Sequence, residues 1–247
     1  MRKVSAIAHR GFSAAAPENT LAAFRKAIEC GPDMMECDVH CTNDGHMVVI
    51  HDPTVDRTTN GTGSVTDMAL AEIKELDAGS WFGPEFVGQR IPTLEELLDL
   101  TKGQSKLIVE IKDEGTEDQA VEIVQGRGMS DEVLLTSFHY RVGMRLPALD
   151  PGIPFIPLVY VEGKAIGDEA VRLADAAANA NGSIFGVNYR AITPDLIEAT
   201  HAANMRQMAW TVDKEQDMRT LVDMGVDILA SNDILLLLSV LSEMGVR

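Results

Sequence analysis

Three acidic residues of this sequence have the types and spacing of a metal site. Glu36 and Asp38 lie two residues apart in an apolar run, so on a β-strand their side chains point to the same face. Glu110 ends another apolar run, and on a neighbouring strand it would point the same way. Crowded carboxylates repel one another unless a cation holds them, so we expect one divalent cation here, Mg²⁺ or Ca²⁺. The alternative is that each carboxylate pairs with Arg10 or Lys112.

Two histidines are expected beside these carboxylates. His9 ends the first apolar run of the chain, and His51 follows a run that a hairpin would bring back to the same place. Imidazole titrates near neutral pH, so the two side chains could act as a general acid and a general base. The alternative is that both histidines are structural.

Net charge limits the partners that this chain could bind. Its 21 Lys and Arg residues against 38 Asp and Glu residues give a formal charge of −17, which repels phosphate backbones, so we expect no nucleic acid partner. A small anionic substrate would need local cations. Arg10 and Lys112 supply them, as a planar fork and a point charge. With a metal and two imidazoles, this set indicates metal-assisted phosphoryl transfer from an anionic ester.

The elements that must position these residues alternate along the chain. Strand-like apolar runs are separated by segments with helical spacing, an α/β pattern. Without a hairpin run at residues 47–50, eight β units remain, and eight parallel strands closed on themselves form a TIM (β/α)8 barrel of ~250 residues. A doubly wound sheet ranks second because no GxGxxG follows the first strand. The expected barrel strands are residues 4–8, 34–37, 107–111, 133–136, 154–160, 183–187, 207–212 and 227–230.

The hairpin follows the second barrel strand and fixes where His51 lies. Asp-Gly is a strong hairpin signal, and Asp44-Gly45 separates residues 39–42 from residues 47–50. A two-residue loop at this position would set Asp38 opposite His51. A slip of one pair would place His51 beside Glu36 or His40 instead.

Composition favours one domain over residues 1–247. Hydrophobic residues make up 45% and charged residues 24%, both ordinary for a globular protein. No apolar run approaches the ~20 residues that span a bilayer, so we expect no membrane insertion. Residues 53–92 form a long connection over the barrel, either as a packed cover or as part of the substrate pocket.

Two further features favour a cytoplasmic protein. The basic start Met1-Arg2-Lys3 is followed by too short an apolar stretch for a secretory signal. Cys30, Cys37 and Cys41 are odd in number and lack CxxC spacing, so they imply no disulfide framework and read as core thiols. The sequence leaves open whether the chain forms a homo-oligomer.

A set of motifs runs in order over nearly the whole chain. They are Ala8-His9-Arg10-Gly11, Pro17-Glu18-Asn19-Thr20, Glu36-Cys37-Asp38-Val39, Asp44-Gly45, Val48-Val49-Ile50-His51-Asp52, Asp56-Arg57-Thr58-Thr59-Asn60-Gly61-Thr62-Gly63, Ile91-Pro92-Thr93-Leu94-Glu95-Glu96, Glu110-Ile111-Lys112, Ser137-Phe138 and Trp210-Thr211-Val212. Single motifs such as Ser-Phe are weak, but the ordered set is specific. It resembles the glycerophosphodiester phosphodiesterases.

This resemblance implies a metal-dependent TIM-barrel enzyme that hydrolyses glycerophosphodiesters to glycerol 3-phosphate and an alcohol. In members of the family, the glycerol hydroxyl next to the ester attacks phosphorus, and water then opens the cyclic phosphate. Matched motif by motif, the roles are His9 and His51 as the acid–base pair, Glu36, Asp38 and Glu110 as metal ligands, Arg10 and Lys112 as phosphate ligands, and Trp210 against the glycerol. The alternative for Trp210 is a core residue at the barrel rim.

Other parts of the pattern are structural or atypical. Asn19 or Thr20 is expected to cap the following helix and to position the loop after His9. Residues 225–233 depart from the family, which usually has Gly-Val-Asp-Gly, two apolar residues, Thr-Asp and a Pro soon after. The second Gly and the Thr-Asp pair are both missing here, where the chain has Ile228 and Ser231-Asn232, and this leaves the role of the strand end open. We assign no role to His139, where an acidic residue is common.

Three rival functions fit the sequence less well. A metal-dependent amidohydrolase typically needs His-x-His on the first strand, where this chain has His9-Arg10. A phosphodiesterase of the same superfamily acting on phosphatidylinositol or sphingomyelin would favour exposed aromatic residues or a basic rim. The charge of −17 and the 5% aromatic content argue against it. A non-catalytic barrel would have lost a histidine or a ligand, and every expected position is filled.

Overall fold

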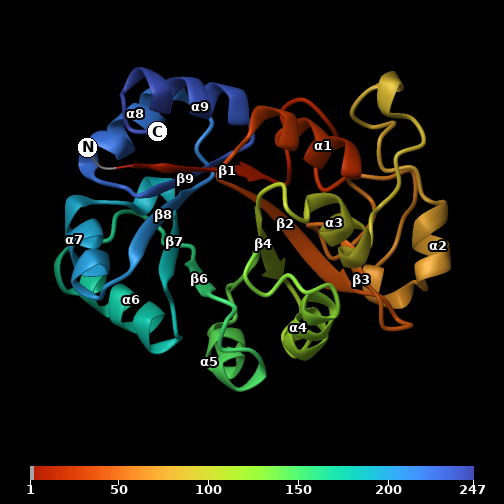
Figure 1. Ribbon diagram of the computed structural model, residues 1–247, viewed down its shortest axis with the longest axis horizontal. Helices are drawn as coiled ribbons and strands as arrows, with labels where there is room; N and C mark the ends of the chain where they lie inside the picture. Colours follow the sequence, from red (N-terminus) through yellow and green to blue (C-terminus); the bar gives the residue numbers. More distant parts are fainter. Residues whose placement is uncertain (1–2) are drawn as a thin grey trace.

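Eight parallel strands close into a barrel in the computed structural model, which describes residues 3–247 (Figure 1). Within the described residues, β1 pairs with both β2 and β9, and this closes the ring. The TIM-barrel prediction is thereby confirmed. Met1 and Arg2, part of the basic N-terminal run, lie outside the described residues. The barrel strands are β1 (Ser5–His9), β2 (Met34–Cys41), β4 (Lys106–Ile111), β5 (Val133–Ser137), β6 (Phe155–Val159), β7 (Ile184–Asn188), β8 (Arg206–Trp210) and β9 (Ile228–Ser231).

All the helices described except α2 surround the barrel and pack on its outer face (Figure 1). Side-chain caps set several of their first residues. Thr20 accepts a hydrogen bond from the amide of Ala23 and so caps α1, which leaves Asn19 free for another contact. The helices are α1 (Leu21–Cys30), α2 (Leu70–Glu75), α3 (Leu94–Thr101), α4 (Glu117–Gly126), α5 (Tyr140–Leu149), α6 (Gly167–Asn179), α7 (Pro194–Ala202), α8 (Glu215–Met224) and α9 (Ile234–Glu243), with short 3₁₀ turns η1 (Val65–Asp67), η2 (Pro84–Phe86) and η3 (Tyr189–Ala191).

Alternation along each strand decides what the barrel interior contains. Side chains two residues apart share a face, so Met34, Glu36 and Asp38 of β2 all point inward. Apolar side chains fill the lower interior, and the polar ones follow at the carboxyl ends of the strands, where TIM-barrel chemistry gathers. The inward apolar cluster consists of Ile7, Met34, Ile108, Leu134, Ile156, Leu158, Ile184, Met208, Ile228 and Ala230.

The hairpin after β2 has a different loop from the one expected. Strand β3 (Met47–Val49) pairs antiparallel with β2, but Cys41 lies opposite Met47 and the amide of Ile50 donates to the carbonyl of Asp38. The loop therefore has three residues, 43–45, and the predicted pairing of Asp38 with His51 is wrong. Gly45 at φ 79° explains the extra residue, because three-residue hairpin loops end in a left-handed residue.

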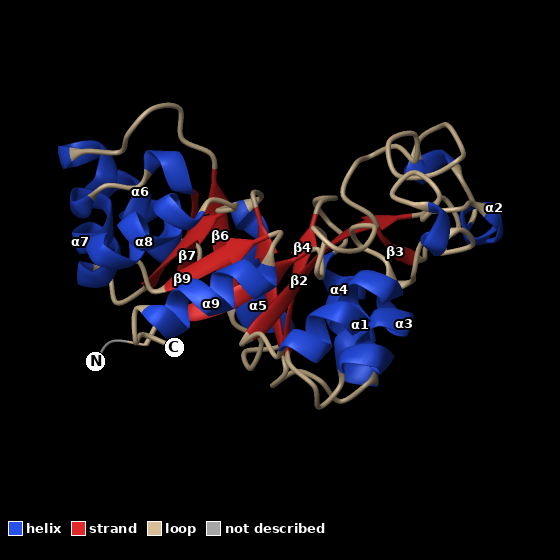
Figure 2. Cartoon of the chain, turned by 90° about the horizontal axis from the view of Figure 1, so that it is seen from above, coloured by secondary structure: helices blue, strands red, loops and turns tan. Residues whose placement is uncertain are grey.

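Residues 53–92 pack beside the barrel around α2 and the two turns η1 and η2. Figure 2 shows this segment, which we call the excursion, next to β3 and at a distance from α6 and α7. The short helix expected near residues 70–76 is α2. The segment and β3 share an apolar cluster of their own, made of Val48, Ile50, Val55, Val65, Ile73, Ala78 and Ile91.

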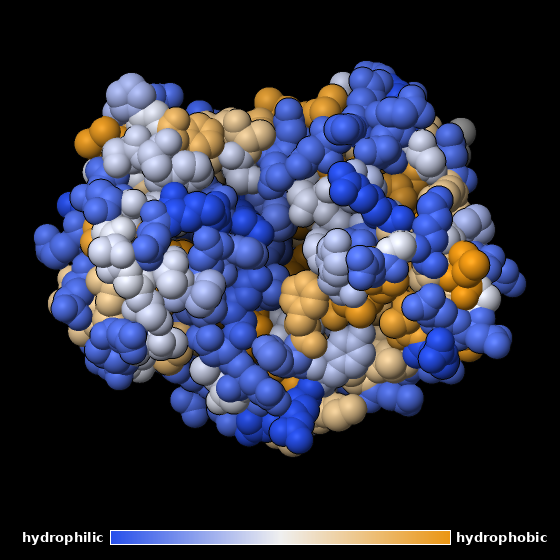
Figure 3. Space-filling view, turned by 180° about the vertical axis from the view of Figure 1, so that it is seen from behind, coloured by the Kyte–Doolittle hydropathy of each residue, from blue (hydrophilic) through white to orange (hydrophobic). Residues whose placement is uncertain are grey.

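The surface agrees with the acidic composition. Seen from behind, it is mostly hydrophilic with apolar side chains in small groups (Figure 3). Among residues 3–247, no helix is both long and apolar enough to cross a bilayer.

Candidate active site

A pocket of ≈ 590 Å³ opens at the carboxyl ends of the barrel strands. Seven of the eight residues predicted for the site line it, and the eighth, Asp38, is fully buried beside them. None of the lining residues comes from the excursion. The lining residues are Ile7, His9, Arg10, Glu36, His51, Ile108, Glu110, Lys112, Thr136, Phe138, Leu158, Met208, Trp210, Thr211 and Ala230.

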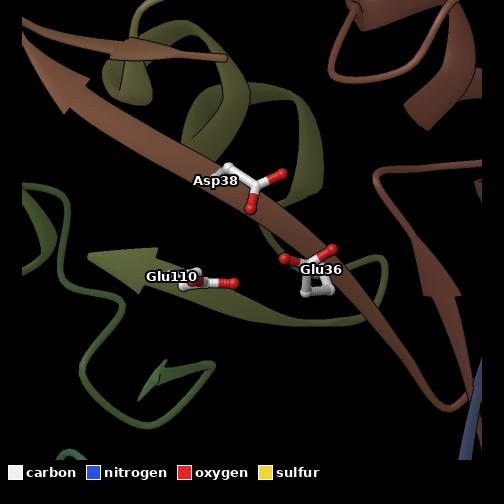
Figure 4. Close-up of side chains that lie close together, drawn as sticks. All are labelled: Glu36, Asp38 and Glu110. Carbon is white, nitrogen blue, oxygen red and sulfur yellow. The ribbon is translucent and has the colours of Figure 1, made fainter. Parts of the chain in front are cut away.

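Glu36, Asp38 and Glu110 lie close together on adjacent strands (Figure 4). Each offers a carboxylate oxygen, and these oxygens all lie within 4.8 Å of one another. All three side chains are buried. Register explains the grouping, because Asp38 of β2 is paired with Glu110 of β4. This set of oxygen atoms suits a hard divalent cation.

Burial and mutual repulsion dominate the charge of this group. Burial, together with the charges of Asp38 and Glu110, raises the pKa of Glu36 well above its usual range. Burial and the charge of Asp38 raise the pKa of Glu110 to about 7. Burial opposes ionisation of Asp38 too, but Lys112 and Arg10 outweigh it and hold the pKa of Asp38 below its usual range. Without a further cation, Glu36 and Glu110 therefore hold their protons more readily than ordinary carboxyl groups do, and Asp38 carries the charge that pairs with Lys112 and Arg10.

Arg10 and Lys112 turn toward the carboxylates. The Lys112 ammonium lies 2.9 Å from Asp38 Oδ1 and 2.6 Å from Glu110 Oε1, and Arg10 Nε lies 3.2 Å from Asp38 Oδ2. The ion pairs considered as an alternative to a metal are therefore present. Asn19 adds a hydrogen bond from Nδ2 to Asp38 Oδ2 at 2.8 Å, a role that the helix-cap prediction missed.

His9 reaches the pocket from the end of β1. Its Nε2 lies 3.9 Å from Glu36 Oε2, too far for a hydrogen bond, and its Nδ1 is 2.8 Å from Oδ1 of Asn232. Burial, with the charge of Arg10, lowers the pKa of His9 to about 4. The ring is therefore neutral near pH 7, the state in which it can accept a proton.

His51 is held by a different kind of partner. Its Nδ1 lies 2.7 Å from Oδ1 of Asp52, and its backbone carbonyl is 3.2 Å from Nε2 of His40. Arg57 of the excursion donates from Nε to Asp52 Oδ2 at 2.6 Å. Burial, together with Arg10 and Lys112, lowers the pKa of His51.

Two aromatic side chains stand at the rim of the pocket. Phe138, after β5, and Trp210, at the end of β8, meet edge to face with their ring centroids 5.7 Å apart. Trp210 packs against the apolar cluster of the barrel interior as well. Trp210 therefore lines the pocket and packs in the barrel interior, and its contact with the glycerol stays a prediction.

Comparison with known proteins shows which family this chain belongs to, a question that the geometry of the site alone leaves open. A sequence model of the glycerophosphoryl diester phosphodiesterase family matches residues 9–236. The chain belongs to this family. A glycerophosphodiester phosphodiesterase from Caldanaerobacter subterraneus subsp. tengcongensis is 40% identical over 94% of this chain and 95% of its own length. The resemblance seen in the motifs is thereby confirmed, and so is the enzyme class, a phosphoric diester hydrolase.

Solved structures agree with this assignment. A phosphodiesterase from Oleispira antarctica, in complex with the product sn-glycerol-3-phosphate, shares 31% identity and a TM-score of 0.86, and covers 96% of each chain. A glycerophosphodiester phosphodiesterase from Agrobacterium tumefaciens shares 31% identity and a TM-score of 0.81, over 97% of this chain and 100% of its own.

Proposed function

We propose that this chain hydrolyses glycerophosphodiesters to glycerol 3-phosphate and an alcohol at the mouth of its barrel. The observation that carries the proposal is the meeting of three buried carboxylates, two cations and two histidines around one pocket. Membership of the family and the product complex of the Oleispira antarctica relative support the same substrate class.

Glu36, Asp38 and Glu110 are the proposed ligands of one divalent cation, Mg²⁺ or Ca²⁺. The residues fit such an ion, because their donor atoms are all carboxylate oxygens that lie within 4.8 Å of one another, and all three side chains are buried. When bound, the ion would neutralise charge on the phosphate. The apolar interior below it, with Ile7 and Ile108, lowers the local dielectric and strengthens these interactions.

The remaining steps belong to side chains of this chain. Arg10 and Lys112 line the pocket and would bind the phosphate oxygens. His9 and His51 would form the acid–base pair, one taking the proton of the attacking glycerol hydroxyl and the other giving a proton to the oxygen of the leaving alcohol. Water then opens the cyclic phosphate, and the two histidines exchange roles. Trp210 would pack against the glycerol carbons.

Two further proposals concern the setting of this reaction. Residues 1–247 act as one domain, a proposal that the single nine-stranded sheet supports. A cytoplasmic location is supported by three free thiols, Cys30, Cys37 and Cys41, since such compartments keep thiols reduced.

Release of glycerol 3-phosphate from glycerophosphocholine and glycerophosphoethanolamine tests the proposal. The assay is run after EDTA treatment, then with Mg²⁺ or Ca²⁺ restored, and repeated with His51→Ala. His46→Ala is the matched control, because this exposed histidine lies in the same hairpin and outside the pocket. Metal-dependent release that His51→Ala loses and His46→Ala keeps supports the proposal. If neither diester releases glycerol 3-phosphate with either metal, the substrate assignment is wrong.

A further inference from the structure

The atypical segment after β9 supplies the partner of His9. Asn232 Oδ1 is 2.8 Å from Nδ1 of His9 and accepts a hydrogen bond from Ser13 Oγ at 2.9 Å. Asn232 Nδ2 donates to Oδ2 of Asp213 at 2.7 Å, and the Asn232 amide donates to Oδ1 of the same carboxylate at 2.8 Å. Ser231 Oγ donates to this carboxylate as well, at 3.0 Å. These residues tie the ends of β1, β8 and β9 together.

This network fixes which way the Asn232 side chain points. A carboxylate only accepts hydrogen bonds, so the atom of Asn232 that faces Asp213 must be the NH₂ group. Oδ1 then faces His9, and because that oxygen only accepts, Nδ1 of His9 must carry the hydrogen. In the neutral ring the hydrogen on one nitrogen leaves the other nitrogen bare. Nε2 of His9 therefore presents its lone pair.

We propose that Asn232, oriented by Asp213, is a positioning residue that holds His9 in the tautomer with a bare Nε2 at the pocket. The proposal rests on the proposed function, in which His9 handles a proton. It also gives a role to the strand end where this chain has Ser231-Asn232 in place of the usual Thr-Asp.

The two histidines are thus oriented by chemically different groups. Asp52 beside His51 brings a negative charge, whereas Asn232 beside His9 orients the ring with a neutral oxygen. The negative charge that orients the Asn232 side-chain amide is on Asp213, which contacts Asn232 through that amide. This arrangement selects the tautomer of His9 without placing a carboxylate on Nδ1.

Imidazole ¹⁵N chemical shifts test the tautomer without using activity. Long-range ¹H–¹⁵N spectra of the labelled protein are recorded near neutral pH, and the signal of His9 is assigned from its loss in His9→Asn. We expect a protonated Nδ1 and a bare Nε2 in the wild type. In Asn232→Ala and in Asp213→Asn the population moves toward the Nε2–H form, because the oriented acceptor is lost or can turn round. A wild-type His9 protonated on Nε2 overturns the proposal.

Steady-state kinetics test whether the orientation of His9 matters for catalysis, and a variant in which residues 213 and 232 exchange their side chains tests the pairing. Asn232→Ala should lower kcat by about 10- to 100-fold, less than the ~10²–10⁴ contributed by a complete general acid or base, with KM changed less than about twofold. Asn232→Asp should lose activity because two carboxylates then face each other. The double variant Asp213→Asn with Asn232→Asp restores a carboxylate–amide pair and should recover most of kcat.

Controls distinguish a specific effect of Asn232 on His9 from misfolding of the variants and from failure of the proposed function. Asn43→Ala removes an exposed asparagine whose Nδ2 donates to the carbonyl of Asp67 in η1, and because neither residue lines the pocket it should keep wild-type kcat. Melting temperatures report whether each variant folds, and Asp213→Asn carries the test if Asn232→Ala does not. Unchanged His9 shifts and kcat in folded Asn232→Ala, or a double variant no better than Asn232→Asp, overturn the proposal. Wild-type inactivity on both diesters together with the expected shifts refutes the proposed function alone.

Discussion

Arg57 donates from Nη1 and Nη2 to the two carboxylate oxygens of Glu18, at 2.9 and 2.8 Å. The same guanidinium donates to Asp52, the partner of His51, and Glu18 in turn accepts a hydrogen bond from Arg10 at 2.8 Å. One residue of the excursion therefore supports both a proposed catalytic histidine and a proposed phosphate ligand, although it does not line the pocket.

Replacing Arg57 should lower activity without unfolding the barrel. In Arg57→Ala, Asp52 and Glu18 lose their bidentate donor, so His51 and Arg10 lose alignment. We expect kcat/KM to fall about 10- to 100-fold, as is typical when a supporting partner of a site residue is removed. Arg57→Lys should recover little, because an ammonium cannot reproduce the fork. Arg90→Ala, an exposed arginine of the same excursion, is the control and should leave kcat/KM unchanged.

Metal binding should depend on the three carboxylates directly. EDTA should abolish activity, and calorimetric titration with Mg²⁺ or Ca²⁺ should show one site. Glu110→Gln replaces a charged oxygen ligand by a neutral amide and should weaken binding by about tenfold or more. Glu114→Gln changes an exposed acid on the loop that follows β4, and this variant should bind metal as the wild type does. Equal affinity in the two variants would remove Glu110 from the ligand set.

Trp210 should contribute to substrate binding more than to the chemical step. Loss of its ring in Trp210→Ala removes apolar contact with the glycerol and the edge-to-face contact with Phe138, so we expect KM to rise about tenfold with kcat nearly unchanged. The other tryptophan offers a matched control. Trp81 lies in the excursion and does not line the pocket, so the KM of Trp81→Ala should match that of the wild type.

Asp77 should make the stability of the excursion depend on pH. Backbone amides of Gly88, Gly79 and Ser80 donate to its carboxylate and lower its pKa to about 2. Because the unfolded value is about 3.9, this contribution is complete above about pH 4 and is lost as pH falls toward 2. The difference in urea midpoint between wild type and Asp77→Asn should therefore shrink over that window. A difference independent of pH would contradict this account.

Local rules predicted the parts of the site that neighbours in sequence determine. Glu36 and Asp38 share a face because they are two residues apart, and Lys112 follows Glu110 in the same way. The hairpin register was missed because the loop contains Asn43 as well as Asp44-Gly45, and this one extra residue shifts every pair by one. Such a shift depends on the turn conformation, which the Asp-Gly signal alone does not specify.

Contacts between distant parts of the chain could not be predicted from the sequence. Asn232 and His9 are 223 positions apart, and only closure of the barrel at β1 and β9 brings them together. Arg57 belonged to a quoted motif, but nothing in its neighbours indicates that it binds Glu18. The cap at Thr20 was predictable, whereas the contact of Asn19 with Asp38 follows from the turn after β1.

The excursion has an apolar cluster that it shares with the hairpin, and its Phe86 packs in a second, small cluster with Ala16 and with Ala23 of α1. Changes confined to the cluster shared with the hairpin should therefore leave the apolar interior of the eight strands in place, because none of its residues belongs to that interior. Much of the segment can therefore diverge among related enzymes. A segment that replaces the excursion must still place a cationic side chain against Asp52 and Glu18, as Arg57 does here.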